Sequence, residues 1–330
     1  MGEALFLPLP NPKYERPPMA ATIPSVIRET LAVPGSDASI PMITLKGGAG
    51  PRFALTAGVH ADEYVGEQAL VELARELADV ELAGSVTIVP VANTVSFERR
   101  GTSMVPNEED RGETNLNRVF PGDAEGNLAQ RVAYAVFHGA IEGADFYVDL
   151  HSGDYYEDLA PHLYYVADLP VGDASRALAA CTDVAAVVPC YETVSGGTYA
   201  AAAAAGTPSI LLERGGMGAW SREEVDAVKR DILNMLRHAG IVAGEALDLR
   251  AAQYDYEDMR ALYAPVAGCW YPAKRSGSAF AAGEVLGEIR DLFGEVLHEV
   301  VAPGAGCVIY QTGSLNVVKD GPLIAYGLYA

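Results

Sequence analysis

Two histidines and one glutamate in this chain have the types and the spacing that a zinc site requires. His60 and Glu63 lie three positions apart, so one turn of chain can present both side chains on the same side. His151 follows a separate apolar stretch and can complete the set. Catalytic zinc sites use three protein ligands of these kinds and keep a fourth position for water. We therefore predict a zinc ion at these three residues.

Glu213 ends another apolar stretch and is free to act as a general base. Zinc lowers the pKa of bound water to about 7, and a neighbouring carboxylate can then take its proton. The H-x-x-E spacing alone is weak, because a turn of a surface helix gives the same pattern. Placing His151 and Glu213 at strand ends strengthens the prediction, since buried charges without partners are costly. Asp149 is expected on the other face of its strand from His151, as a partner of the ligands or as a structural acid.

A long, turn-rich segment over residues 97–123 holds the cations that an anionic substrate would need. Long loops of this kind in compact domains are often functional. Asn117 and Arg118 combine an amide with a planar guanidinium, which suits recognition of a carboxylate. An arginine upstream of this pair could polarise the scissile carbonyl. The alternative interpretation is that the upstream arginines only neutralise acidic neighbours.

The elements that must position these residues alternate between short apolar runs and amphipathic stretches. This alternation predicts an α/β fold with a mixed, largely parallel sheet flanked by helices. Ligands of such sheets bind beyond the carboxyl ends of the strands, so the residues at these ends should converge. The runs interpreted as buried strands are FALTAG, SVTIVPV, ADFYVDL, HLYYVA and PSILLE. Helices are expected over residues 64–78, 128–141 and 221–239.

The pattern changes after about residue 249, where short strands, glycine and proline replace helical periodicity. We predict a catalytic domain over residues 1–250, which begins with a hairpin at about residues 20–48. A smaller, all-β domain is expected over residues 251–330.

The bulk composition excludes several classes of partner. A formal net charge of −21 argues against nucleic acid or an anionic membrane surface. No apolar run approaches the roughly 20 residues that span a bilayer. The four cysteines are widely spaced, and no export signal is recognised, which predicts a cytoplasmic protein with reduced thiols.

Four motifs, in the order GVHADE, NLNRVFPG, DLHSG and LLERGG, resemble those of the succinylglutamate desuccinylase and aspartoacylase family, which is related to the zinc carboxypeptidases. The resemblance covers about residues 50–220, and the C-terminal module is similar to the family's barrel-sandwich domain. It implies one zinc ion per chain at the three ligands named above, with Glu213 as the base. It also implies that Asn117 and Arg118 bind a substrate carboxylate.

The family's carbonyl-polarising arginine precedes the N-L-N-R element, and Arg99, Arg100 and Arg111 compete for that role. We expect Arg100 to be catalytic and Arg111 to lie among the substrate-binding residues. Tyr199 is a further substrate-binding candidate that could equally be a core residue. The C-terminal module has no lysine at its central hairpin, Asp291–Gly294, so a structural or oligomer-forming role is expected rather than lipoyl or biotin attachment.

The function expected from these observations is zinc-dependent hydrolysis of the amide of a small N-acyl amino acid or related N-acyl amine. A metallocarboxypeptidase would use the same zinc and the same Asn-Arg pair, and an esterase could use the same scaffold. The non-enzymatic alternative is a metal- or small-ligand-binding protein, which would have no need of Glu213 as a base. A serine hydrolase is disfavoured because no G-x-S-x-G element is present.

Overall fold

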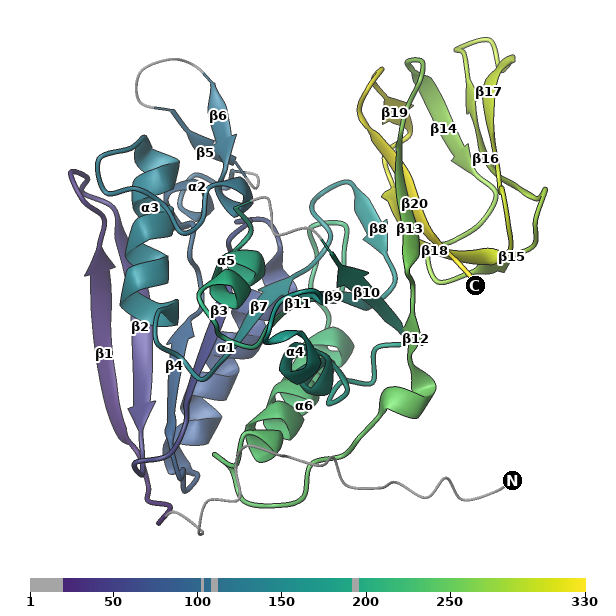
Figure 1. Cartoon of the computed structure of the whole chain (residues 1–330). Coiled ribbons are helices and arrows are strands. Elements are labelled where there is room, and N and C mark those ends of the chain that lie inside the picture. The colour runs from purple at the N-terminus through teal and green to yellow at the C-terminus, as the bar shows by residue number, and fades with distance from the viewer. Residues whose placement is uncertain (1–19, 102–103, 108–111, 192–195) are drawn as a thin grey trace.

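The computed structural model describes residues 20–101, 104–107, 112–191 and 196–330 (Figure 1). Its larger part is built on a nine-stranded sheet with the strand order β1-β2-β4-β3-β7-β11-β9-β10-β12. The strands are β1 (Ser25–Ala32), β2 (Ser39–Lys46), β3 (Arg52–Ala57), β4 (Ser85–Val89), β7 (Phe146–His151), β9 (His162–Val166), β10 (Ala186–Cys190), β11 (Ser209–Glu213) and β12 (Tyr254–Asp255). The pairs β1·β2, β2·β4 and β9·β11 are antiparallel, and the others are parallel. The predicted fold class, a mixed and largely parallel sheet, is confirmed.

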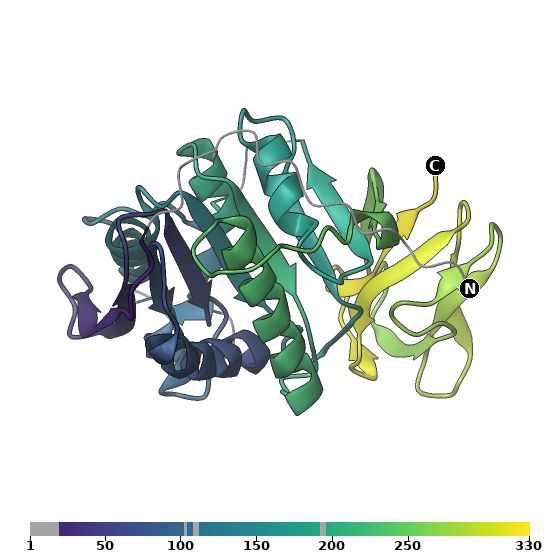
Figure 2. The same cartoon turned by 90° about the horizontal axis from the view of Figure 1, so that it is seen from below.

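Helices cover both faces of this sheet. Residues of α1 (Tyr64–Glu76) and α6 (Arg222–His238) share one hydrophobic core with the sheet, and the two helices lie side by side (Figure 2). On the opposite face, α3 (Leu128–Val136) and the shorter α5 (Thr198–Ala204) pack in a second core. The remaining helices are α2 (Thr94–Phe97) and α4 (Gly172–Ala179).

The three predicted helices are present with small differences at their ends. Helix α1 continues into a 3₁₀ turn, and α3 continues into a π turn that ends at Ile141. Ser221 caps α6, because its hydroxyl accepts a hydrogen bond from the Glu224 amide at 3.2 Å.

Side chains along β7 alternate between the two cores. Phe146, Val148 and Leu150 pack with α1 and α6. Tyr147 belongs to the core on the other face, and a strand has a two-residue period, so Asp149 and His151 share that face. The expectation that Asp149 lies on the opposite face from His151 is therefore wrong.

The C-terminal strands form two further sheets around a separate core. Their order is β13-β20-β18-β15 in one sheet and β17-β16-β14-β19 in the other. The strands are β13 (Asp258–Tyr263), β14 (Gly268–Pro272), β15 (Ala279–Phe280), β16 (Val285–Arg290), β17 (Val296–Val301), β18 (Gly306–Thr312), β19 (Asn316–Val317) and β20 (Pro322–Leu328). The first sheet also holds β8 (Glu157–Leu159), an excursion of the larger part that pairs antiparallel with β18. This pairing fixes the C-terminal strands against the end of the main sheet.

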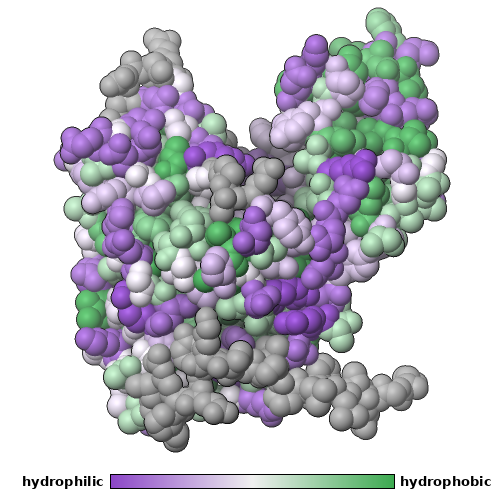
Figure 3. Space-filling view, viewed as in Figure 1, coloured by the Kyte–Doolittle hydropathy of each residue, from purple (hydrophilic) through white to green (hydrophobic). Residues whose placement is uncertain are grey.

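A space-filling view shows a hollow between the larger part and the C-terminal strands, and hydrophobic surface gathered on the latter (Figure 3). A small hairpin, β5 (Met104–Pro106) with β6 (Glu113–Asn115), precedes a 3₁₀ turn at Leu116–Arg118. Within the described residues, no helix combines the length and apolar character that crossing a membrane requires.

Candidate active site

The three predicted metal ligands meet at the carboxyl ends of β3 and β7. One donor atom from each of His60, Glu63 and His151 lies within 4.8 Å of the other two. His60 Nδ1 lies 2.6 Å from Glu63 Oε1, and His151 Nδ1 lies 2.7 Å from Glu63 Oε2. The backbone amide of Ser152 also donates to Glu63 Oε2, at 3.1 Å. Both imidazoles thus direct the same ring nitrogen at one carboxylate.

The far nitrogen of each ring faces an acceptor. His60 Nε2 lies 3.1 Å from Asn115 Oδ1, and His151 Nε2 lies 2.9 Å from Asp149 Oδ2. An acceptor at Nε2 holds the proton there and leaves Nδ1 free to bind a metal. Sequence reasoning missed Asn115, although it lies two residues before Asn117 in the same motif.

Asp149 is itself held on both sides. Its Oδ1 accepts a hydrogen bond from the Thr56 hydroxyl at 2.6 Å, and its Oδ2 accepts one from the Thr198 hydroxyl. Its side chain is fully buried. Neither threonine was recognised from the sequence, because their contribution depends on the β3–β7 register and on the start of α5. The imidazole of His151 is consequently fixed in one orientation.

This donor set fits zinc, which binds imidazole nitrogen and carboxylate oxygen. Burial alone would raise the pKa of Glu63, but the facing His60 and His151 rings lower it to about 2. Glu63 is therefore present as the carboxylate, which is the form that binds a metal.

Glu213 lies beside this group. It ends β11, which pairs in parallel with β7 so that Glu213 is opposite His151. Its Oε2 is buried and has no hydrogen-bond partner among the described residues. Burial raises the pKa of Glu213 well above its usual range, against the opposing charge of His151. An unpartnered carboxyl with a raised pKa next to a metal site suits proton transfer.

The next residue along the chain points the other way. Arg214 faces α6, where its guanidinium pairs with Asp231 at 2.9 Å and also with Asp183. The change of side between Glu213, the last residue of β11, and Arg214 thus directs the glutamate toward the predicted metal ligands and anchors the arginine under α6.

Asn117 and Arg118, the pair predicted to bind a carboxylate, lie in different environments. Arg118 is exposed, donates from one terminal nitrogen to the Asn117 carbonyl at 2.8 Å, and lines a cavity. Asn117 is buried, where its Oδ1 accepts from the Thr198 amide at 3.0 Å and its Nδ2 lies 3.4 Å from His151 Nε2. Arg118 is therefore placed to meet a ligand, whereas Asn117 supports the metal-ligand side in this structure.

The other predicted residues are not gathered at the same point. Arg100 is exposed at a turn after α2 with a left-handed backbone (φ 53°), and no hydrogen bond or ion pair joins it to the described metal ligands. Tyr199 is half-buried and donates from its hydroxyl to Cys190 Sγ at 3.4 Å. Arg111 lies outside the described residues. Their roles in the reaction stay predictions.

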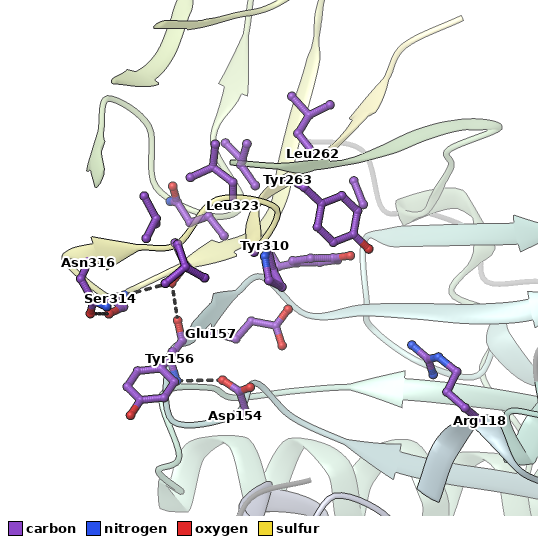
Figure 4. Close-up of a pocket in the computed structure, with 18 residues that line it drawn as sticks. Arg118, Asp154, Tyr156, Glu157, Leu262, Tyr263, Tyr310, Ser314, Asn316 and Leu323 are labelled. Atoms are coloured by element: carbon purple, nitrogen blue, oxygen red, sulfur yellow. Dashed lines mark hydrogen bonds between the residues drawn. The ribbon is translucent and has the colours of Figure 1, made fainter. Parts of the chain in front are cut away.

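A cavity of about 560 Å³ lies beside Arg118, between the end of the main sheet and the C-terminal strands (Figure 4). Arg118, Asp154 and Glu157 line it from the larger part, and Tyr263 and Tyr310 are among the residues that line it from the C-terminal strands. The sequence did not single out either acid. Both follow the DLHSG motif, where the chain leaves β7 of the main sheet and forms β8.

Comparison with known proteins assigns the chain to a family. The catalytic domain of the succinylglutamate desuccinylase/aspartoacylase family matches residues 49–239. The chain belongs to this family. The resemblance in the four sequence motifs is confirmed, and the protein is a member of a deacylase family.

Individual relatives extend the match beyond that domain. The N-alpha-acetyl-L-2,4-diaminobutyric acid deacetylase of Halomonas elongata is 32% identical over 246 residues, which are 72% of this chain and 67% of that protein. The product-bound structure of the ectoine utilization protein EutE (DoeB) from Ruegeria pomeroyi matches with a TM-score of 0.82 and 28% identity, and covers 96% of this chain and 100% of that one. A succinylglutamate desuccinylase/aspartoacylase from Rhodobacter sphaeroides matches with a TM-score of 0.77 and 25% identity, over 98% and 99% of the two chains.

Proposed function

We propose that this protein is a zinc-dependent amidohydrolase that removes the acyl group from a small N-acyl amino acid. The observation that carries the proposal is the convergence of His60, Glu63 and His151 beside the unpartnered oxygen of Glu213. Membership of a deacylase family supports the same reaction class. The relative from Halomonas elongata, named for an acetylated diamino acid, makes N-acetyl amino acids the first substrates to test.

In this mechanism the residues of the chain divide three tasks. Zinc, when bound by His60, Glu63 and His151, supplies Lewis acidity to the scissile carbonyl and to water at the site. Glu213 takes a proton from the attacking water and returns it to the departing amine. Arg118 holds the substrate carboxylate through its guanidinium. The products are a free carboxylic acid and a free amino acid.

The cavity wall favours a small substrate over a peptide. Strands of the C-terminal module close one side of the cavity next to Arg118, which leaves about 560 Å³. A carboxypeptidase must admit the chain that precedes its substrate's last residue, so this wall opposes that alternative. We propose on the same basis that residues 251–330 act as a domain that limits access. All four cysteines are free thiols, which fits the proposed cytoplasmic location.

The test is a deacylation screen with zinc-loaded protein. Acetyl, succinyl and longer N-acyl amino acids are compared with dipeptides and with matching esters, and release of the amine or alcohol is measured. We expect turnover of N-acyl amino acids above that of the dipeptides. Faster cleavage of dipeptides would instead support the carboxypeptidase, and zinc binding without any turnover would support the binding protein.

A further inference from the structure

A second pocket lies beside helix α1. Its volume is about 340 Å³, and none of its lining residues also lines the cavity next to Arg118. Segments from α1, from the chain after β4, from α2 and from the turn before α6 surround it. None of the described metal ligands lines it, and neither does Glu213. The pocket therefore shares no residue with the proposed reaction site.

One carboxyl group in this pocket has no partner. Only 5% of Glu67 is exposed, and its Oε1 has no hydrogen-bond partner among the described residues. Gly58 leaves room for this oxygen, since an added Cβ would lie 2.6 Å from it. A buried carboxyl of this kind is costly unless it binds a proton or a cation.

The charges near Glu67 are all negative. Burial, together with the charges of Glu63 and Asp62 just before α1, raises the pKa of Glu67 to about 9. The residues that line the pocket from the other elements are uncharged. The empty pocket thus holds a protonated carboxyl near neutral pH, and a cation that binds there displaces the proton.

Arg222 lies near the pocket and leaves Glu67 without a counter-ion. Its guanidinium carbon lies 5.7 Å from the centre of the Trp220 ring. Its two terminal nitrogens pair with the two carboxylate oxygens of Glu72, at 2.7 and 2.9 Å. The charge of this arginine is therefore balanced by Glu72, and a counter-ion for Glu67 must come from a ligand.

Aromatic rings surround the mouth of the pocket. Phe97 and Trp220 are 44% and 50% exposed, and Tyr64 is a third aromatic residue in the lining. The faces of such rings attract cations, and their apolar surface packs against an alkyl chain. Aromatic rings around one carboxyl are a combination that suits an organic cation.

The polar groups favour a cation that carries N–H donors. The side-chain amide of Gln68, which also lines the pocket, donates to Glu72 at 2.7 Å, and its carbonyl oxygen remains as an acceptor. A primary ammonium group has three donors and can bind this oxygen and the Glu67 carboxylate together. A metal ion fits less well, because Glu67 is not part of the cluster of possible metal donors in the described residues.

We propose that the pocket at Glu67 is a second ligand site, which binds a small primary alkylammonium ion outside the proposed reaction site. The ammonium group donates to the Glu67 carboxylate, and the alkyl chain packs against Phe97 and Trp220. Binding releases the proton that Glu67 holds in the empty pocket to the solvent. The site does not depend on the proposed deacylase function, because the two places share no residue.

The first experiment measures the binding of three small probes to the unaltered, zinc-loaded protein. The probes are n-butylammonium, which has a charge and N–H donors, tetramethylammonium, which has a charge without donors, and n-butanol, which has no charge. A hydrogen bond to a charged group corresponds to about 10- to 100-fold in affinity, so n-butylammonium should bind more tightly than the others by this factor. Fluorescence of Trp220 reports the binding, since the other tryptophan, Trp270, is buried in the C-terminal core.

Proton release distinguishes a ligand site from a carboxyl that is only structural. Titration calorimetry with n-butylammonium is carried out near neutral pH in two buffers of different ionisation enthalpy. Because the pKa of Glu67 in the empty pocket is about 9, each bound ion should release about one proton. A carboxyl that stays protonated and takes no part in binding would release none.

The next experiment changes the residues of the pocket. Glu67→Gln should lower the affinity for n-butylammonium about 10- to 100-fold and abolish the proton release. Glu223→Gln is the matched control, since Glu223 is exposed, lies three residues after Trp220 and does not line the pocket. Trp220→Leu should lower the affinity about 3- to 30-fold, measured by calorimetry.

Each outcome decides for or against the site. Equal affinity of the three probes, or no binding at millimolar concentration, would overturn it. Unchanged affinity and proton release in Glu67→Gln would overturn the role of Glu67. Should Glu67→Gln not fold, the probe series, the proton release and Trp220→Leu still test the proposal. Because none of these measurements uses turnover, failure of the deacylase proposal and failure of this one are seen separately.

Discussion

The two sides of the proposed site differ in how their polar groups are partnered. At the ends of β3 and β7, the imidazoles of His60 and His151 each have an acceptor at both ring nitrogens. Across the cavity, Arg118 and Glu157 form no ion pair with the described residues, and both line open space. The first arrangement holds side chains in place before any ligand arrives, whereas the second leaves charges available for a ligand.

The fold itself orients the residues of the first group, whereas the residues of the second group gain partners only when a substrate binds. Groups with internal partners are expected to control metal binding, and groups without them are expected to control substrate choice. Glu213 is the exception on the metal side, since its Oε2 has no partner although it is buried. A carboxyl oxygen left without a partner beside the predicted ligands is free to take a proton from water.

The largest effect is expected at a ligand itself. His151→Ala removes one of the three donors, so the zinc content should fall from about one ion per chain to nearly none. Elemental analysis after dialysis measures this content. His162→Ala offers a control, because His162 is buried nearby but is not one of the clustered donors. Unchanged zinc in His151→Ala would contradict the ligand assignment.

Glu213→Gln should abolish most of the activity while the metal stays bound. Losing the group that moves the proton is expected to lower kcat by about 10²- to 10⁴-fold. Zinc content and the midpoint of thermal unfolding should remain close to those of the unaltered protein. Full turnover in this variant would remove Glu213 from the catalytic role.

His162, which packs against the cavity residue Tyr310, is a buried side chain that does have a hydrogen-bond partner. It is fully buried, its Nδ1 donates to the Ala160 carbonyl at 2.8 Å, and it stacks on Tyr310 with ring centroids 5.8 Å apart. Burial lowers its pKa to about 4, so the folded protein binds the proton less readily than the unfolded chain. The stability from the neutral ring is therefore complete above about pH 6.5 and is lost as the pH falls toward 4.

His162→Phe removes this titration and keeps an aromatic ring. Relative to the variant, the free energy of unfolding of the unaltered protein should fall by up to about 3 kcal/mol between pH 7 and pH 4. Urea unfolding at both pH values measures the difference. A difference that does not change with pH would show that the ring is not held in its neutral form.

Two carboxylates, one from each side, give the most direct comparison. Asp149→Asn weakens the support of His151 and should reduce zinc affinity about 10- to 100-fold. Glu157→Gln, on the cavity side, should leave zinc affinity unchanged. Competition with a chelator of known affinity measures both. Equal losses of zinc affinity in the two variants would contradict the proposed difference between the metal-binding residues and the cavity residues.

Arg118→Lys should give the smallest change. Lysine keeps the positive charge but cannot form the two parallel hydrogen bonds of a guanidinium, so KM should rise about 10-fold with little change in kcat. Steady-state kinetics with an N-acetyl amino acid separates the two constants. A fall in kcat at constant KM would place Arg118 at the scissile carbonyl rather than at the substrate carboxylate.

Local patterns in the sequence predicted most of the elements and the candidate metal ligands. Apolar runs with a two-residue period and amphipathic stretches indicated the strands and helices, because local backbone geometry sets these periods. The spacing of His60 and Glu63 and the strand-end positions of His151 and Glu213 depend on the same local geometry. These four residues could therefore be named without knowing the order of the strands.

The distant groups that complete the site are brought to it by the tertiary structure. Asn115 and Thr198 reach His60 and Asp149 from segments whose positions depend on strand order and on packing against the sheet. Glu157 meets the C-terminal wall because β8 pairs with β18, more than 140 residues further along the chain. No local pattern encodes such a pairing, since its free energy comes from contacts that exist only after both parts have folded.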